Sequence, residues 1–217
     1  MRSLVCFALK EEAAPFQKMA KNKSDTSILL TGIGKANAEK SVRASFAGSL
    51  PDLVFTCGFA GGLNPDLKIG DVVFEMPFEI KDSRGGSLQA KLISAGAKPA
   101  KFICVDRVAT TGADKKKLRD DTGADVGEME SAAIHAVCAE HGIPCATIRV
   151  ISDTANEDLP LDFNALAKPD KNIDMGKLLL AIARSPGKIG ALMELQKKTK
   201  FAAERLAKVL EKVVIAS

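Results

Sequence analysis

Apolar runs of strand length alternate with segments of helical periodicity through most of the chain. We predict strands over residues 3–9, 26–34, 51–63, 70–80, 101–109, 126–128 and 144–153. We predict helices over residues 11–20, 35–47, 114–120 and 131–140. Strands that are apolar along nearly their whole length and are separated by helices are typical of a sheet with both faces covered. The pattern therefore predicts an α/β fold, in which a mixed, mainly parallel central sheet is flanked by helices on both faces.

The C-terminal part of the chain has a different pattern, which is helical throughout. From Met175 onward only helical periodicity is found, and it is interrupted at Ser185-Pro186-Gly187. The apolar positions of the last helix are Ile189, Leu192, Met193, Ala203, Leu206, Leu210 and Val213. Because neither a repeat nor a linker divides the 217 residues, we predict a single domain, with a core over 1–157 and a helical C-terminal extension over 158–217.

The net charge of +4 is concentrated in this extension. Residues 168–212 contain 11 Lys and Arg against 5 Asp and Glu, so the rest of the chain is slightly acidic. A basic amphipathic segment can rest on an anionic membrane surface, or it can pack against the body of the protein or another subunit and expose its charged face. Packing is favoured here, while contact with a membrane surface stays open. Nucleic-acid binding is not expected, because the chain has no Trp or Tyr on which bases could stack.

The cysteines and histidines do not form a pattern of metal ligands. Five cysteines, with no CxxC pair, are scattered along the chain, and several fall in apolar runs. This usage indicates buried, reduced thiols in a cytoplasmic protein. His135 and His141 have no familiar zinc spacing to these cysteines, so we expect neither a metal nor a cofactor. We also expect no signal peptide, because the first apolar run is too short and no small-residue cleavage site is present. We expect no membrane span, because no apolar run reaches roughly 18 residues.

Acidic side chains follow the ends of three predicted strands. The polar residues at these ends are Glu11 and Glu12, Glu128 and Glu130, and Ser152 and Asp153. The carboxyl ends of parallel strands meet at one edge of an open sheet, where ligands bind. Each carboxylate taken alone could simply cap a helix or complement its dipole. Three strands that deliver carboxylates to one edge predict a site.

Two glycine-rich segments also follow strands. The first, TGIGKANA, has Asn37 at the third glycine position of a dinucleotide-binding fingerprint, and the chain lacks the GxxxxGK[ST] spacing of a P-loop. We predict a tight turn there. The second, CGFAGGL, contains Gly58, Gly61 and Gly62, which allow the backbone to approach a ligand closely.

Five segments, in their order and spacing, resemble the nucleoside phosphorylase superfamily. They are FALKEE, TGIGKANA, GFAGGLNPDLKIGDVV, VGEMESAA and IRVISDTANED. The similarity covers roughly residues 1–157 and is greatest to the branch of methylthioadenosine/S-adenosylhomocysteine nucleosidases. The segments DTANEDLPLDFN and GKLLLAIARSPGKIGALMELQKKTKFAAERL are similar to a subgroup associated with hopanoid biosynthesis, for which removal of adenine from adenosylhopane is the implied reaction. The resemblance implies a phosphorylase/hydrolase-like fold, a purine nucleoside substrate and a homo-oligomer.

The resemblance also implies a role for each site residue. Glu130 binds the ribose hydroxyls, and Met129 packs against the sugar. Asp153 lies by N7 of the purine and assists departure of the base, and Glu12 orders or deprotonates the attacking water. The other predicted substrate-binding residues are Val108 and Ala109, which meet the base largely through their backbone, and Gly58, Phe59 and Ser152.

These residue types suit cleavage of an N-glycosidic bond. The transition state carries positive charge on the ribose ring, which carboxylates stabilise, and the leaving purine needs a proton. Water is the predicted nucleophile, because phosphorylases of the superfamily typically carry Arg where this chain has Glu12 and Thr56. A phosphate-dependent purine nucleoside phosphorylase and a salvage nucleosidase for methylthioadenosine or S-adenosylhomocysteine stay open as alternatives.

The segment between GDVV and DRVA is much shorter than in typical nucleosidases of this branch. In those enzymes it carries aromatic residues that close over the 5′-alkylthio group, whereas residues 74–105 contain no Tyr or Trp. Two interpretations stay open: an open 5′ end of the pocket, suited to a long apolar substituent, or a trimmed loop replaced by the C-terminal helices. Phe59, where many relatives have Ser, is a second departure from the pattern of the branch.

Overall fold

The computed structural model describes residues 1–81, 85–166, 180 and 186–215. Its strands are β1 (Ser3–Phe7), β2 (Thr26–Leu30), β3 (Leu53–Gly62), β4 (Val72–Glu75), β5 (Lys98–Pro99), β6 (Phe102–Cys104), β7 (Val126–Glu128) and β8 (Cys145–Asp153). Its helices are α1 (Lys10–Ala20), α2 (Lys35–Phe46), α3 (Leu88–Ser94), α4 (Gly112–Thr122), α5 (Ser131–Glu140), α6 (Phe163–Leu166) and α8 (Ile189–Leu210), with the helical turns η1 (Pro186–Lys188) and η2 (Glu211–Ile215). The helical pattern predicted over 175–185 lies almost entirely outside the described residues.

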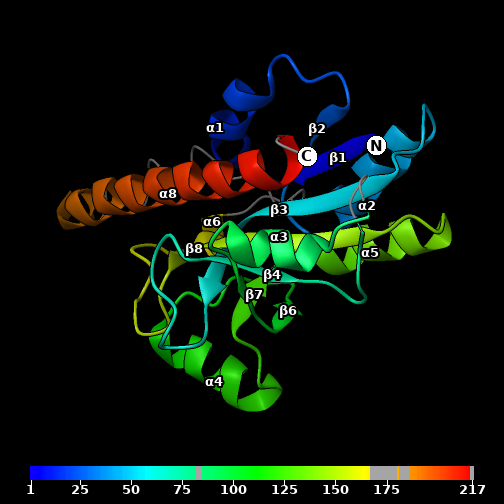
Figure 1. Cartoon of the computed structure of the whole chain (residues 1–217). Coiled ribbons are helices and arrows are strands. Elements are labelled where there is room, and N and C mark those ends of the chain that lie inside the picture. The colour runs from blue at the N-terminus through cyan, green and yellow to red at the C-terminus, as the bar shows by residue number, and fades with distance from the viewer. Residues whose placement is uncertain (82–84, 167–179, 181–185, 216–217) are drawn as a thin grey trace.

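The central sheet is mixed and mainly parallel, which confirms the predicted fold class. Its strand order is β2-β1-β3-β8-β4-β5, and β7 pairs with both β3 and β6. β1, β2, β3 and β8 run parallel to one another, with Ser3 opposite both Thr26 and Leu53. β4 is antiparallel to β8, and β7 is antiparallel to β3. The C-terminal ends of β1, β3 and β8 therefore meet at one edge (Figure 1).

The end of β3 changes its partner and thereby brings a second strand to this edge. The first half of β3 pairs with β1, whereas Gly61 and Gly62 pair with Gly127 and Val126 of β7. The pairing with β8 shifts register between Ala60 and Gly61, and such irregularities re-aim side chains near sites. Because β7 runs antiparallel to β3 from this pairing, the residues at its end return toward the middle of β3 and β8, where Glu128 meets Arg149.

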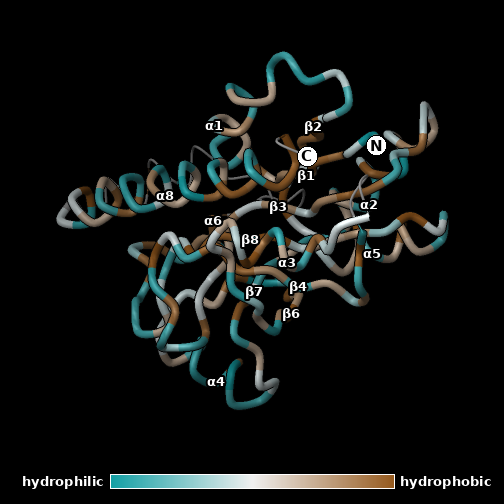
Figure 2. The backbone as a smooth tube through the Cα atoms, viewed as in Figure 1, coloured by the Kyte–Doolittle hydropathy of each residue, from teal (hydrophilic) through white to brown (hydrophobic). Residues whose placement is uncertain are grey.

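Helices cover the sheet through two separate apolar clusters. The larger cluster joins the strands to α1, α3, α8 and η2. The smaller cluster joins β1 and β3 to α2 and α5, mainly through Val42, Phe46, Ile134 and Val137. In Figure 2 the apolar segments follow the strands, while hydrophilic segments lie on the outer sides of the helices. The burial of apolar surface in these clusters is the main stabilising contribution to the fold.

α8 is buried along its C-terminal half only. Leu206 and Leu210 are fully buried, and this half of the helix packs mainly against α1 and β8. Ile189 and Met193, which belong to the predicted apolar stripe, are instead about half exposed. The preference for packing is therefore confirmed for the C-terminal half of the helix, whereas packing of its first turns against another subunit stays a prediction. None of the described helices is long and apolar enough to cross a bilayer.

The structure differs from the predicted elements between β4 and α4. The strands predicted over 70–80 and 101–109 shorten to β4 and β6, and β4 ends two residues before Pro77, which cannot donate to a strand ladder. α3 and β5 were not predicted. Ser87 is the N-cap of α3, where its hydroxyl accepts a hydrogen bond of 3.1 Å from the N–H of Ala90. All five cysteines are free thiols, and four of them are buried.

Candidate active site

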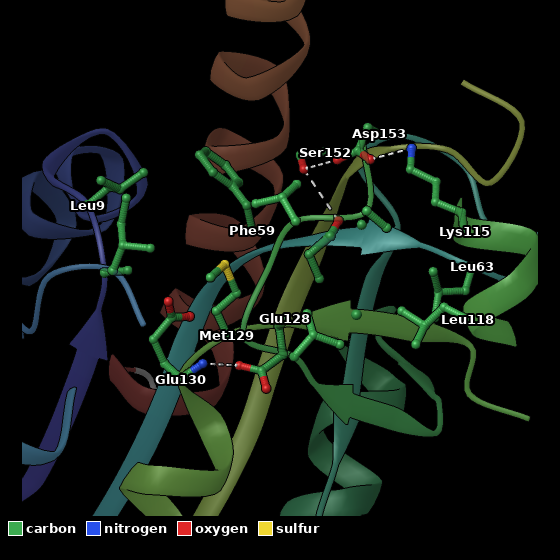
Figure 3. A pocket seen from close by; sticks show the side chains of 18 of the residues that line it. Leu9, Phe59, Leu63, Lys115, Leu118, Glu128, Met129, Glu130, Ser152 and Asp153 are labelled. Atoms are coloured by element: carbon green, nitrogen blue, oxygen red, sulfur yellow. Dashed lines mark hydrogen bonds and ion pairs between the residues drawn. The ribbon is translucent and has the colours of Figure 1, made fainter. Parts of the chain in front are cut away.

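A cavity of about 200 Å³ lies at the C-terminal edge of the parallel strands (Figure 3). It collects residues from the ends of β1, β3, β7 and β8, from the start of α1 and from the loop after β6. Eight of the nine predicted site residues line it: Glu12, Phe59, Val108, Ala109, Met129, Glu130, Ser152 and Asp153. Gly58 is not among the lining residues. The cavity thus brings together residues that are more than 140 positions apart in the sequence.

Glu12 is held by backbone groups in the first turn of α1. Its Oε2 accepts a hydrogen bond of 2.8 Å from the N–H of Leu9, and its Oε1 accepts one of 2.8 Å from the N–H of Phe59. The side chain is buried. Burial raises the pKa of Glu12 to about 7, although the charge of Arg149 and the two N–H donors act in the opposite direction. A carboxyl group of this kind changes protonation near neutral pH, which suits a general base.

Arg149 is the electrostatic centre of the site, and the sequence analysis did not single it out. It lies in the middle of β8 with only 1% of its surface exposed. One terminal nitrogen donates to Glu128 Oε2 at 2.6 Å and to Glu130 Oε2 at 3.2 Å. The other donates to the carbonyl of Cys57 at 3.2 Å, while Nε has no hydrogen-bond partner among the described residues. A buried guanidinium therefore balances several buried carboxylates.

Glu128 and Glu130, which flank Met129, have different functions in the structure. Glu128 anchors the start of α5, because its carboxylate accepts hydrogen bonds from the N–H groups of Glu130 and Ser131 and from the Ser131 hydroxyl. Burial would raise the pKa of Glu128, but Arg149 and these hydrogen bonds lower it below its ordinary value. Glu128 is thus a structural anion that caps a helix.

Glu130 is instead held toward the cavity, beside Met129 (Figure 3). Its Oε1 accepts a hydrogen bond of 2.8 Å from the N–H of Gly34, in the tight turn before α2. Burial raises the pKa of Glu130, and the charge of Glu128 adds to this rise against the effect of Arg149. Both acids of the Glu-Met-Glu step therefore line the cavity, but the carboxylate of Glu128 is occupied by the start of α5, whereas that of Glu130 is not.

Gly58 lies behind the cavity, between Glu12 and Arg149. Its φ of +148° is rarely adopted by other residues, and a Cβ built at this position would lie 2.6 Å from Arg149 Nη1 and 2.7 Å from Glu12 Oε1. Because both groups are buried and fixed by hydrogen bonds, neither can move away cheaply.

Gly58→Ala is therefore expected to lower the free energy of unfolding by about 2 kcal/mol or more, through backbone strain and overpacking. Urea denaturation measures this loss. Gly96→Ala is a matched control for the strain alone, since Gly96 also has positive φ but no atom within 4 Å of its added Cβ. Equal losses for the two variants would contradict the overpacking at Gly58.

Asp153 is fixed by two side chains at the opposite end of the cavity from Leu9 (Figure 3). The hydroxyl of Ser152 donates to Asp153 Oδ1 at 2.8 Å, and Lys115 Nζ lies 2.6 Å from Asp153 Oδ2. Lys115 comes from α4 and was not predicted as a site residue. A hydroxyl donor thus binds one oxygen of the Asp153 carboxyl group, and a cation binds the other.

The loop after β6 presents its backbone to the cavity at Ala109. The carboxamide of Asn164 on α6 accepts a hydrogen bond from the N–H of Val108 and donates one to its carbonyl, both at 2.9 Å. The backbone of Val108 is thereby occupied, whereas that of Ala109 has no hydrogen bond to the part of the chain that the structure describes. Of the two residues predicted to meet a base through their backbone, Ala109 is the one whose groups are free.

Comparison with known proteins agrees with this geometry. The profile of the Phosphorylase superfamily matches residues 12–74 and 90–214. The chain is 31% identical over 173 residues to the 5′-methylthioadenosine/S-adenosylhomocysteine nucleosidase of Shewanella halifaxensis, covering 64% of this chain and 73% of that protein.

Two solved structures extend this comparison to the fold. The futalosine hydrolase of Helicobacter pylori aligns with a TM-score of 0.72 at 18% identity, over 100% of this chain and 98% of that one. The nucleosidase of Neisseria meningitidis, in complex with methylthio-immucillin-A, aligns with a TM-score of 0.71 at 20% identity, over 100% and 99%. The profile match spans most of the sequence, and these likenesses show the same fold; the chain therefore belongs to the phosphorylase superfamily.

Proposed function

We propose that this protein hydrolyses the N-glycosidic bond of a 5′-substituted adenosine and releases adenine. The observation that carries the proposal is the gathering of three buried carboxylates, Glu12, Glu130 and Asp153, on one cavity with three different sets of partners. The relative from Shewanella halifaxensis, named as a nucleosidase, supports the same reaction class.

Each carboxylate has a separate part in the proposed reaction. Glu12 removes a proton from the attacking water, because a group that titrates near neutral pH can act as a base there. Glu130 holds the ribose hydroxyls and stabilises the positive charge that develops on the ring. Asp153 transfers a proton to the purine as the bond to the sugar breaks. The backbone of Ala109 binds the edge of the base.

Water is favoured over phosphate as the nucleophile by the charges of the cavity. A bound phosphate dianion needs cations or a cluster of N–H groups. Among the lining residues in the described part of the chain, Lys115 is the one cationic side chain, and it is paired with Asp153. Arg149 lies behind the cavity and is already surrounded by carboxylates. A phosphate dianion would therefore meet mainly negative charge.

A long apolar 5′ substituent is the finer part of the proposal. With the base at Asp153, the sugar and its 5′ end extend toward Leu9 and Phe59, which lie on the other side of the cavity (Figure 3). The side chains of Leu9 and Phe59 give that side of the cavity an apolar lining. The short segment between β4 and β6 and the resemblance to hopanoid-associated proteins support a substrate such as adenosylhopane. We also propose that the protein is cytoplasmic and forms a homo-oligomer. Light scattering of the purified protein would test the oligomeric state.

Release of free base from a panel of nucleosides tests the function. The panel contains adenosine, methylthioadenosine and a long-chain 5′-alkyl adenosine, each with and without phosphate. We expect release without phosphate, with the long-chain compound preferred. Preference for methylthioadenosine would indicate a salvage nucleosidase, and release only with phosphate would replace hydrolysis by phosphorolysis.

Glu130→Gln is expected to lower kcat/KM for the ribonucleoside by about 10-fold or more, because hydrogen bonds to a charged group contribute about 1.5–3 kcal/mol. The 2′,3′-dideoxy analogue of the same substrate should lose less, since it has no hydroxyls for Glu130 to bind and is affected only through the charge on the ring. Steady-state kinetics on the two substrates measures the difference. Equal losses on both would show that Glu130 does not hold the hydroxyls.

A further inference from the structure

Lys115 differs from its neighbours in a run of three consecutive lysines. Lys116 and Lys117 lie on the surface of α4, where each pairs with an aspartate four residues later and keeps 76% of its side chain exposed. Lys115 keeps 1% and lines the cavity. Burying an ammonium group is costly unless partners compensate it, so the position of Lys115 calls for a function.

All three protons of the Lys115 ammonium have an acceptor. Nζ lies 2.6 Å from Asp153 Oδ2 and donates to the carbonyls of Thr154 and Glu157, each at 2.8 Å. Two of these acceptors are fixed backbone groups of the segment that follows β8. The ammonium therefore has a defined position, with one N–H directed at Asp153 (Figure 3).

These contacts bear on the proton that the leaving base requires. Asp153 Oδ1 accepts a hydrogen bond from the Ser152 hydroxyl, and Asp153 Oδ2 lies 2.6 Å from Lys115 Nζ. The ammonium of Lys115 is therefore a source of a proton in direct contact with the carboxyl group that lines the cavity. We propose that Lys115 is a positioning residue that also stores the proton which Asp153 delivers to the base. This inference rests on the proposed function.

The proposed step is balanced in protons and electrons. As the bond between C1′ and N9 breaks, its electron pair stays with the purine, which takes a proton from Asp153. Lys115 transfers a proton from Nζ to Asp153 and becomes a neutral amine, while the oxygen of water bonds to C1′ and Glu12 takes the water's proton. Exchange with solvent then returns a proton to Lys115 and removes one from Glu12.

A change of pH can act on Lys115 through the charged groups around it, so these groups have to be identified. Asp153 of β8 is in direct contact, and the carboxylate of Glu157 adds its charge from the following segment. Glu157 is in turn paired with Lys198 of α8 at 2.6 Å. Asp153 is therefore the carboxylate that exchanges a proton with Lys115, while Glu157 is balanced by its own cation.

The test compares two substrates in the Lys115→Met variant, with Lys116→Met as the matched control. The first substrate is the purine nucleoside that the wild type hydrolyses. The second is 4-nitrophenyl β-D-ribofuranoside, whose nitrophenolate leaves without a proton. At about pH 8 we expect Lys115→Met to lose about 100-fold in kcat/KM on the purine nucleoside and less than about threefold on the nitrophenyl riboside.

The pH profile adds a readout that a structural role would not change. At about pH 5.5 solvent supplies protons more readily, so the purine defect of Lys115→Met, which keeps the carboxyl group of Asp153 as the relay, should shrink to about tenfold or less. Asp153→Asn should show the purine defect at both pH values, because no proton-transferring group remains. Lys116→Met should resemble the wild type throughout.

Three results would overturn the inference. They are unchanged purine turnover in Lys115→Met, an equal loss on both substrates, and a purine defect that does not change with pH. The nitrophenyl substrate also shows that the variant is folded, since its turnover requires an intact site. If the wild type hydrolysed neither substrate, the proposed function would fail and the inference with it, and this outcome is distinct from the other three.

Discussion

Glu12→Gln is expected to lower kcat by about 10³-fold, on purine nucleosides and on nitrophenyl riboside alike. The amide has nearly the same shape as the carboxyl group but cannot take a proton from water. Because Glu12 acts at the attacking side of the reaction, the nature of the leaving group should not alter the loss. Initial-rate kinetics on both substrates measures it.

The pH dependence of the wild type follows from the same residue. A base works in its deprotonated form, and burial raises the pKa of Glu12 to about 7, so kcat/KM should rise as pH increases through about 7. Glu11→Gln is the matched control, since Glu11 is the exposed neighbour of Glu12 in the same turn of α1. Comparable losses in the two variants, or a wild-type profile that is flat through neutral pH, would contradict the role of Glu12.

The raised pKa of Glu12 also has a cost in stability. Its folded-state pKa of about 7 lies above its ordinary value of 4.5. The stabilising effect of binding that proton is complete below about pH 4.5 and is lost as pH rises through about 7. Protonation of Glu12 therefore stabilises the fold least at the pH values where Glu12 acts as a base. This is expected for a group whose pKa is shifted for function.

Arg149→Met is expected to lower the free energy of unfolding by about 3–5 kcal/mol, because it leaves buried carboxylates without their cation. Glu128 and Glu130 would then repel each other, and the start of α5 that Glu128 caps would be weakened. Urea denaturation at neutral pH measures the loss. Acidification should recover part of it, since protonation removes the repulsion.

Arg43→Met is the control for this prediction. Arg43 makes two short hydrogen bonds with Glu140, at 2.6 and 2.7 Å, but both side chains are about half exposed. Solvent screens such a pair, so no comparable loss is expected. If Arg149→Met were as stable as Arg43→Met, the carboxylate cluster would not depend on Arg149.

The succession of strands along the chain and the acids at their ends could be predicted, because both follow from local pattern. Near-continuous apolar runs indicated parallel strands, and the rule that ligands bind at their carboxyl ends placed Glu12 and Asp153 on one edge. Glu130 reaches the same cavity for a different reason, because β7, which precedes it, runs antiparallel to β3. The separation of Glu128 from Glu130 could not be predicted, because it depends on which carboxylate reaches the N–H groups at the start of α5.

Arg149 and Lys115 were not predicted as site residues, and only Arg149 had a recognisable signal in the sequence. Arg149 did leave a signal, since a charged residue between Ile148 and Val150 in a fully buried strand must have a partner. Lys115 left none, because its sequence context matches that of Lys116 and only the placement of α4 buries it. The contact of Asn164 with Val108 joins positions 56 residues apart and depends on tertiary structure alone.

The central claim is that water attacks the sugar and that Glu12 activates it. The most direct test is a reaction of the purine nucleoside in heavy-oxygen water with phosphate present, followed by mass spectrometry of the sugar product. The account predicts a free sugar that carries the heavy oxygen at C1, and no such product at comparable rates with Glu12→Gln. A sugar 1-phosphate without the label would contradict it.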